Sequence, residues 1–120
     1  NNIANIKDKT EAETIRFTLP DDIKSEDFEA FFLWNNDFYI FSKENKKTMV
    51  IKVPNTIGSH VATYVTDYKL KGKDTRVTSA DISPDGSTII LLNHDRIWKL
   101  TIFKSDAFFD GNLYYRRRLW

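Results

Sequence analysis

The sequence predicts an all-β fold of two four-stranded antiparallel sheets plus one extra strand. Residues 14–19 alternate between apolar and polar side chains, which is the period-two pattern of a half-buried strand. Short apolar runs rich in aromatic residues recur along the chain, with turn-forming residues between them. Residues 78–93 contain the clearest turn, Pro84-Asp85-Gly86, between two such runs. Because proline fixes φ and glycine adopts a positive φ readily, this segment predicts a hairpin.

The composition is that of a globular chain with one core. The 120 residues are 41% hydrophobic and 29% charged. Eighteen basic and seventeen acidic residues give a net charge of +1, which supplies no broad field for a phosphate backbone and argues against a nucleic-acid partner. The absence of cysteine excludes disulfides, thiolate metal sites and cysteine nucleophiles, and leaves the redox compartment open. No apolar run reaches the ~18 residues that span a bilayer.

The elements are expected in a simple order. Residues 1–12 are polar and form a lead-in, and residues 13–20 form a strand that ends at a proline. A loop is expected at residues 55–60. The other strands are the two arms of the hairpin at residues 78–93 and the segments at residues 27–34, 38–42, 48–53, 61–68, 96–102 and 112–119.

The chain repeats itself with a shift of 50 residues, which places Ala30 on Ala80 and the asparagine-rich turn after Trp34 on the Pro84-Asp85-Gly86 turn. A repeat of ~40–50 residues built from four short strands has the period of a β-propeller blade. Residues 27–70 are then blade one, residues 76–120 are blade two, and residues 13–20 are the outer strand of a preceding blade. Propellers close with roughly four to eight blades, so a partial β-propeller from a longer chain is expected.

A family resemblance agrees with this fold. The segment Ile82-Ser-Pro-Asp-Gly-Ser-Thr-Ile-Ile-Leu-Leu resembles the Ser-Pro-Asp-Gly repeat of WD40-like propellers of the TolB type. A second resemblance is to bacterial secreted or envelope propeller proteins, in which Asp-x-Glu-Ala opens one blade and Val-Thr-x-Ala-Asp opens the next. The similar stretches here are Asp27-Phe-Glu-Ala-Phe-Phe with residues 33–43, and Val77-Thr-Ser-Ala-Asp. The resemblance implies a location in the bacterial envelope or outside the cell. Members of that family are several times longer, so sites shared with their later blades lie outside this chain.

Three carboxylates are the candidate ligand or metal residues. Asp27 and Glu29 lie two residues apart on a predicted strand, so both point to the same face, and Asp81 lies on the equivalent strand of blade two. If these strands are innermost, their carboxylates approach a central channel, where calcium binding or acid–base work is chemically feasible. The favoured alternative is that Glu29 and Asp81 organise the blades, by accepting hydrogen bonds from loop amides and from Arg76 or Lys71.

Other chemical motifs are weak. His60 and His94 have no second ligand at metal spacing, and Asp95 beside His94 fits turn chemistry. No Gly-x-Ser-x-Gly or phosphate-binding loop occurs, so no catalytic or cofactor-binding residue is predicted. The arginines at residues 116–118 alternate in direction on a strand, which favours a solvated outer strand over a basic patch.

Aromatic residues are plentiful and allow two interpretations. Flat rings can stack against sugars, but large side chains also fill the space between twisted sheets, and packing is the favoured interpretation. The residues concerned are Phe31, Phe32, Trp34, Phe38, Tyr39, Phe41, Trp98 and Trp120.

The expected function is a binding or scaffold module that forms part of a β-propeller, with an unidentified ligand. The alternative is a metal-dependent hydrolase of the phytase-like or lactonase-like propeller kind, with Glu29 as the first residue to test. The expected partners are the rest of the propeller or further copies of the chain, bound through open blade faces. A cytoplasmic location remains the alternative to the envelope.

Overall fold

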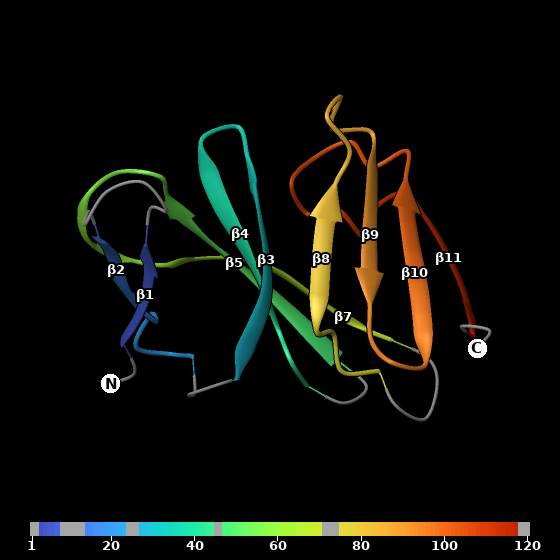
Figure 1. Cartoon of the computed structure of the whole chain (residues 1–120), viewed down its shortest axis with the longest axis horizontal. Coiled ribbons are helices and arrows are strands. Elements are labelled where there is room, and N and C mark those ends of the chain that lie inside the picture. Colours follow the sequence, from blue (N-terminus) through green and yellow to red (C-terminus); the bar gives the residue numbers. More distant parts are fainter. Residues whose placement is uncertain (1–2, 8–13, 24–26, 45–46, 71–74, 118–120) are drawn as a thin grey trace.

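The computed structural model describes residues 3–7, 14–23, 27–44, 47–70 and 75–117. Within these residues every regular element is a β-strand, and the strands form two four-stranded sheets and one three-stranded sheet (Figure 1). The predicted all-β class and the two four-stranded antiparallel sheets are therefore confirmed.

Sheet one has the strand order β3-β4-β5-β7 and is antiparallel throughout. A two-residue turn joins its first two strands, and Asn35 and Asn36 adopt φ values of 55° and 63° there. Asparagine tolerates this left-handed conformation better than most residues, so the predicted turn forms where the sequence places it. The strands are β3 (Phe28–Trp34), β4 (Asp37–Ser42), β5 (Lys47–Pro54) and β7 (Thr63–Lys69).

Sheet two has the order β11-β10-β9-β8 and is also antiparallel. Its hairpin turn contains Gly86 at φ 75°, as the sequence predicts. The carboxylate of Asp85 closes this turn by accepting hydrogen bonds from the hydroxyls of Ser83 and Ser87, each at 2.7 Å. The strands are β8 (Ser79–Ile82), β9 (Thr88–Leu92), β10 (Arg96–Thr101) and β11 (Asn112–Arg117).

The third sheet contains β1 (Ile3–Lys7), β2 (Thr14–Thr18) and β6 (Gly58–Val61). Strand β1 lies in the segment expected as a polar lead-in, and β6 begins inside the segment expected as a loop. Strand β2 pairs antiparallel with β1 and parallel with β6. The ladder supplies the backbone hydrogen bonds that these weakly patterned segments need, which is why they extend despite their composition.

One continuous core lies between the two four-stranded sheets. Each sheet contributes the face on which its alternate side chains are buried, and we call these the inner faces. The inner face of sheet one carries Ala30, Phe32, Tyr39, Phe41 and Val50, and that of sheet two carries Ala80, Ile89, Leu91, Trp98 and Leu100.

The two four-stranded sheets are stacked in the same orientation. Strands β3 and β8 lie side by side and run in the same direction (Figure 1), and β7 approaches β11 at the opposite edge. The 50-residue repeat superposes Phe41 on Leu91, and both are 0% exposed in the same core. The hairpin turns differ in length, with two residues between β3 and β4 and five between β8 and β9, so matching residue numbers do not mean that the same face of each sheet is turned inward. The described residues close no propeller.

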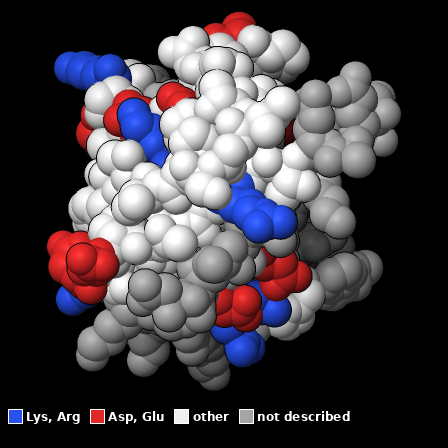
Figure 2. Space-filling model, turned by 90° about the vertical axis from the view of Figure 1, so that its left-hand side faces the viewer, with Lys and Arg blue, Asp and Glu red and all other residues white. Residues whose placement is uncertain are grey.

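The opposite face of sheet one is covered by the third sheet. Ile15 and Phe17 of β2 pack there against a second core that includes Ile40 and Ile51. The layers are therefore the third sheet, sheet one and sheet two. Charged side chains of both signs are interspersed on the side of the molecule where the third sheet lies (Figure 2), as expected for a net charge of +1.

Candidate functional site

The connection between β10 and β11, residues 102–111, builds one wall of a cavity. Ile102 and Phe108 adopt φ values of 57° and 46° in this loop. A left-handed conformation is unfavourable for a branched residue such as Ile102, which is also 68% exposed, so packing elsewhere in the loop must hold it. The carboxylate of Asp110 contributes to this, since it accepts hydrogen bonds from the Lys104 backbone N–H at 3.1 Å and the Ser105 hydroxyl at 2.9 Å.

Phe108 anchors the loop in the core. Its side chain is 1% exposed, and its ring meets those of Phe32, Tyr39 and Phe103 edge-on, with centroids 5.0–5.7 Å apart. Aromatic pairs favour this edge-to-face arrangement because the positive ring edge meets the negative ring face. The loop is thereby fixed on sheet one.

Asp106 ties the same loop to sheet one through polar contacts. Its Oδ2 accepts a hydrogen bond from the Tyr39 hydroxyl at 3.2 Å and pairs with the Lys52 ammonium at 3.0 Å. Oδ1 has no partner among the described residues. Burial, followed by the neighbouring charge of Asp106, raises the pKa of Tyr39 above its ordinary value, so the phenol stays protonated and acts as a donor.

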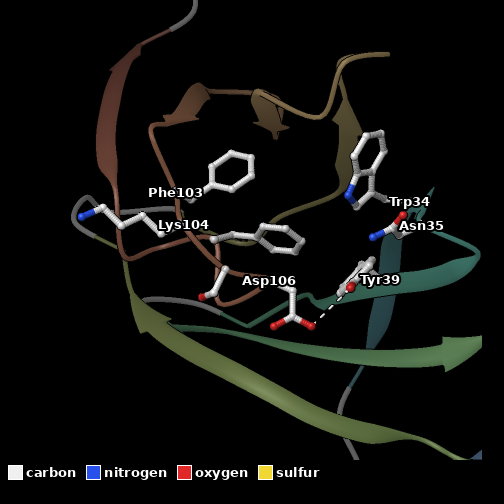
Figure 3. A pocket seen from close by; sticks show the side chains of 8 residues that line it. Trp34, Asn35, Tyr39, Phe103, Lys104 and Asp106 are labelled. Atoms are coloured by element: carbon white, nitrogen blue, oxygen red, sulfur yellow. Dashed lines mark hydrogen bonds between the residues drawn. The ribbon is translucent and has the colours of Figure 1, made fainter.

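These residues line an open cavity of about 220 Å³ on the surface (Figure 3). Trp34 and Phe103 lie on opposite sides of it, while the side chain of Lys104 extends outward. The amide of Asn35 lies beside Trp34 and, like Oδ1 of Asp106, has no partner among the described residues. The cavity thus combines aromatic walls with solvent-exposed polar groups that are open to a ligand. Its lining residues are Trp34, Asn35, Tyr39, Phe103, Lys104, Ser105, Asp106 and Phe108.

The three carboxylates singled out in the sequence lie elsewhere. Glu29 is half exposed and forms an ion pair with Lys43 at 2.9 Å, which raises the pKa of that lysine. Asp81 is exposed, and its Oδ1 accepts a hydrogen bond from the N–H of Ile82 at 2.9 Å. Asp27 is exposed at the start of β3. None of them lines the cavity, and the described part of the chain contains no group of three or more residues of the metal-ligating types.

Both histidines lie in connecting or edge segments. The ring of His60, in β6, contacts the hydroxyl and the carbonyl oxygen of Thr56 at 3.1 and 3.0 Å, which holds it against the loop that precedes β6. His94 lies in the turn between β9 and β10, where the carboxamide of Asn93 accepts hydrogen bonds from the backbone N–H groups of Asp95 and Arg96.

The packing interpretation of the aromatic residues is largely confirmed, because Phe32, Tyr39, Phe41 and Trp98 are buried in the core. Phe31 is 49% exposed, Phe38 is partly buried, and Trp120 lies outside the described residues. Trp34 differs, since it packs at the edge of the core and also lines the cavity.

The loop half of the cavity was missed at the level of sequence. A signal was present, because residues 103–111 combine three phenylalanines with two aspartates and a glycine in a segment too irregular for a strand. Its partner on β4 could not be identified from sequence, since Tyr39 and Asp106 are separated by 67 residues.

Comparison with known proteins leaves the identification open, since no family model, no curated protein and no solved structure matches this sequence. No helix in the described residues is long and apolar enough to span a membrane.

Proposed function

We propose that this chain is a binding module whose cavity between β4 and residues 102–111 holds a small polyhydroxylated ligand of the carbohydrate class. The observation that supports the proposal most is that two aromatic side chains and two solvent-exposed polar side chains line one cavity of about 220 Å³. Binding sites for small molecules typically combine such apolar walls with a few polar groups that fix orientation.

The chemistry of a sugar ring suits these walls. One face of the ring presents C–H groups, which pack on the negative face of an aromatic side chain such as Trp34 or Phe103. Its hydroxyls both donate and accept hydrogen bonds, so they match the carboxylate oxygen of Asp106 and the amide of Asn35. The cavity is small, which limits the occupant to one ring or one end of a longer chain.

The number of carboxylates that line the cavity favours binding over hydrolysis. Most glycoside hydrolases use a pair of carboxyl groups on either side of the scissile bond. Asp106 is the one carboxylate among the described lining residues, and Lys52 and Tyr39 already engage its Oδ2. Nothing in the geometry favours a metal-dependent hydrolase at Asp27, Glu29 or Asp81, so we do not propose one.

The site does not depend on how the chain continues. Both walls come from residues 34–108, so a partial propeller and a two-sheet sandwich would present the same cavity. The 50-residue repeat, the turn motifs and the common direction of β3 and β8 are what support the propeller, while the single core shared by two sheets is compatible with either arrangement. In either case we propose that the sheets are the scaffold and the 102–111 loop is the binding element.

Titration with simple sugars tests the proposal. Nuclear magnetic resonance spectra are recorded with glucose, galactose, N-acetylglucosamine and their methyl glycosides, and the indole signal of Trp34 is followed. We expect at least one sugar to shift that signal, and Trp34→Leu to abolish the binding. Phe31→Leu is the matched control, because Phe31 lies on the outward side of the same strand. Unshifted signals of Trp34 and Asn35 with all of these sugars would refute a carbohydrate ligand.

A further inference from the structure

The outer face of sheet two is the face that the other two sheets leave open. Sheet two is the end layer of the molecule, at the side opposite the third sheet (Figure 1). Alternation along β10 turns Trp98 and Leu100 into the core and turns Ile97 and Lys99 outward. Sheet one has a buried cluster on each face, whereas in the described part of the chain no buried cluster lies against the outer face of sheet two.

The middle of this outer face is apolar. Ile97 pairs with Leu92 across the β9–β10 ladder, and Ile90 lies next to Leu92 on the same side of β9. All three are half-buried, and none belongs to either core. Tyr114 on β11 is 56% exposed and extends this apolar strip toward the edge of the sheet. Contact with a second apolar surface would remove the strip from water, which is favourable in proportion to the area buried.

The outer face is also regular. The three ladders of sheet two run without a register shift, whereas sheet one has a shift in the β3–β4 ladder and another in the β5–β7 ladder. A bulge bends its strand and increases the local twist, so a sheet without one keeps an even surface. An even surface suits face-to-face packing with another sheet.

Charges of opposite sign lie on the two sides of this face. Lys99 on β10 and Arg116 on β11 are exposed on one side, and Asp81 on β8 is exposed on the other. Ile90 separates Asp81 from Lys99, since it is the cross-strand neighbour of both. None of the three charged side chains has an ion-pair partner among the described residues. A single copy therefore leaves both signs of charge uncompensated on this face.

A two-fold axis parallel to the strands brings these charges together. When two copies stack face to face about such an axis, β10 and β11 of one copy lie opposite β8 and β9 of the other. The Asp81 side of each copy then faces the Lys99 and Arg116 side of its partner, and the two apolar strips meet between them. Stacked sheets lie ~10 Å apart, a distance within the combined reach of a lysine and an aspartate side chain.

We propose that the outer face of sheet two is the interface of a symmetric dimer, and that a second copy of this chain is its occupant. The strands of the face are four to six residues long and lie ~4.8 Å apart, so the buried area stays below the ~800 Å² per partner of an ordinary stable interface. We therefore expect a weak dimer, with a dissociation constant of about 10⁻⁴ M. The proposal does not rest on the carbohydrate site, because no residue that lines the Trp34 cavity belongs to this face.

The edges of sheet two suit a second copy less well. The edge of β8 lies against β3 and is not free. The edge strand β11 carries Arg116 and Arg117, which are both exposed, and charged side chains on an edge strand oppose pairing with another chain. The outer face is therefore the better surface for self-association.

A concentration series tests the proposal. Sedimentation velocity gives the mass from micromolar to millimolar protein, and methyl nuclear magnetic resonance spectra are recorded over the same range. We expect the average mass to rise toward the dimer, and the methyl signals of Ile90 and Ile97 to shift with it. The methyl signal of Ile40 is the control and should stay in place, because Ile40 is buried under the third sheet.

Charge exchange between copies tests the two-fold arrangement. Asp81→Lys and Lys99→Glu should each weaken the dimer at least several-fold, because each substitution places like charges opposite each other twice. An equal mixture of the two variants should recover the dimer, since every contact in the mixed pair again joins opposite charges. Asp67→Lys and Lys69→Glu make the same charge changes at exposed positions of β7 in sheet one, and should leave the dimer unchanged.

The apolar strip is tested separately. Ile97→Thr keeps a β-branched side chain but makes the middle of the strip polar, so it should weaken the dimer several-fold while the strand is retained. Ile57→Thr is the matched control, because Ile57 is 64% exposed just before β6 and lies outside this face. Circular dichroism of both variants checks that the fold is kept.

Three outcomes would overturn the proposal. The first is a monomer mass at every concentration, with unmoved methyl signals of Ile90 and Ile97. The second is a dimer that Asp81→Lys and Lys99→Glu leave intact, since its interface would then lie elsewhere, as at the edge of β11. The third is a mixture of these two variants that stays as weak as each variant alone, which would refute the two-fold arrangement.

Discussion

The indole ring of Trp34 lies directly against Gly86. A β-carbon at residue 86 would overlap Cζ2 and Cη2 of that ring, and Gly86 also adopts a left-handed φ of 75°. The turn of sheet two therefore holds one wall of the proposed carbohydrate cavity in sheet one. Glycine is needed there for its conformation and for the room that it leaves to Trp34.

Gly86→Ala should lower the free energy of unfolding by about 1–3 kcal/mol because of backbone strain, and should also displace Trp34. We expect a change in tryptophan fluorescence together with the loss of stability. Gly58→Ala is the control, since Gly58 has φ 126° but open space around its Cα, so only strain is added. If both variants leave the fluorescence unchanged, the contact between Gly86 and Trp34 is not formed in solution.

Phe108→Ala should destabilise the protein by about 3–5 kcal/mol, because it leaves a cavity in a fully buried aromatic cluster. Phe31→Ala removes the same side chain from a half-exposed position and should cost less than about 1 kcal/mol. Urea unfolding followed by circular dichroism measures both. Equal losses would mean that the 102–111 loop is not anchored in the core.

Tyr39→Phe should lower the free energy of unfolding by about 0.5–1.5 kcal/mol, since it removes the hydrogen bond to Asp106. Tyr64→Phe is the matched control, because the Tyr64 hydroxyl donates to Asp67 at 2.6 Å on an exposed edge, where water replaces the bond. A smaller loss for Tyr39→Phe than for Tyr64→Phe would contradict the contact described here.

The raised pKa of Tyr39 also gives a pH dependence. The folded state holds the Tyr39 proton more tightly than the unfolded state, in which the phenol ionises near its ordinary pKa of 10.0. The stabilisation is therefore complete below pH 10 and is lost as pH rises beyond it. We expect the stability difference between the wild type and Tyr39→Phe to shrink above pH 10 in chemical unfolding experiments, and a constant difference would argue against a buried Tyr39.

Asp85 gives the opposite dependence at acid pH. Hydrogen bonds from Ser83 and Ser87 lower the pKa of its carboxyl from 3.8 to about 2. Because the folded-state pKa is the lower one, the stabilisation is present above pH 3.8 and disappears as pH falls toward 2. We expect the carboxyl carbon signal of Asp85 to titrate with a midpoint of about 2, below the ordinary aspartate value of 3.8. A midpoint at the ordinary value would show that the serines do not close the turn.

The strands could be predicted from sequence to a large extent, because alternation is a local property. Ile15 and Phe17 are buried on one side of β2 as their spacing predicts, and the 50-residue repeat places Ala30 and Ala80 on matching strands. Alternation says which residues share a face. It does not say which face of one sheet meets which face of the other, so the packing of the two sheets required the three-dimensional structure.

The cavity could not be predicted for a related reason. Asp106 has no local pattern that sets it apart from other surface charges, and it acquires its surroundings from strands distant in the chain. Strand β6 escaped detection because Gly58-Ser-His lacks apolar alternation and extends only through its pairing with β2. Conversely, the exposed carboxylates Glu29 and Asp81 were conspicuous in the repeat, but neither reaches a cavity.

The parallel pairing of β2 with β6 sets an order of events in folding. Phe17 must meet His60 before this ladder forms, whereas β3 and β4 need only a two-residue turn. The entropy of closing a loop grows with its length, so the local hairpins form early and the third sheet docks late onto a sheet one that already exists. The elements that dock last are commonly the first to detach under native conditions. We therefore expect the apolar surface around Ile40 and Ile51 to be the first core surface that transient opening exposes.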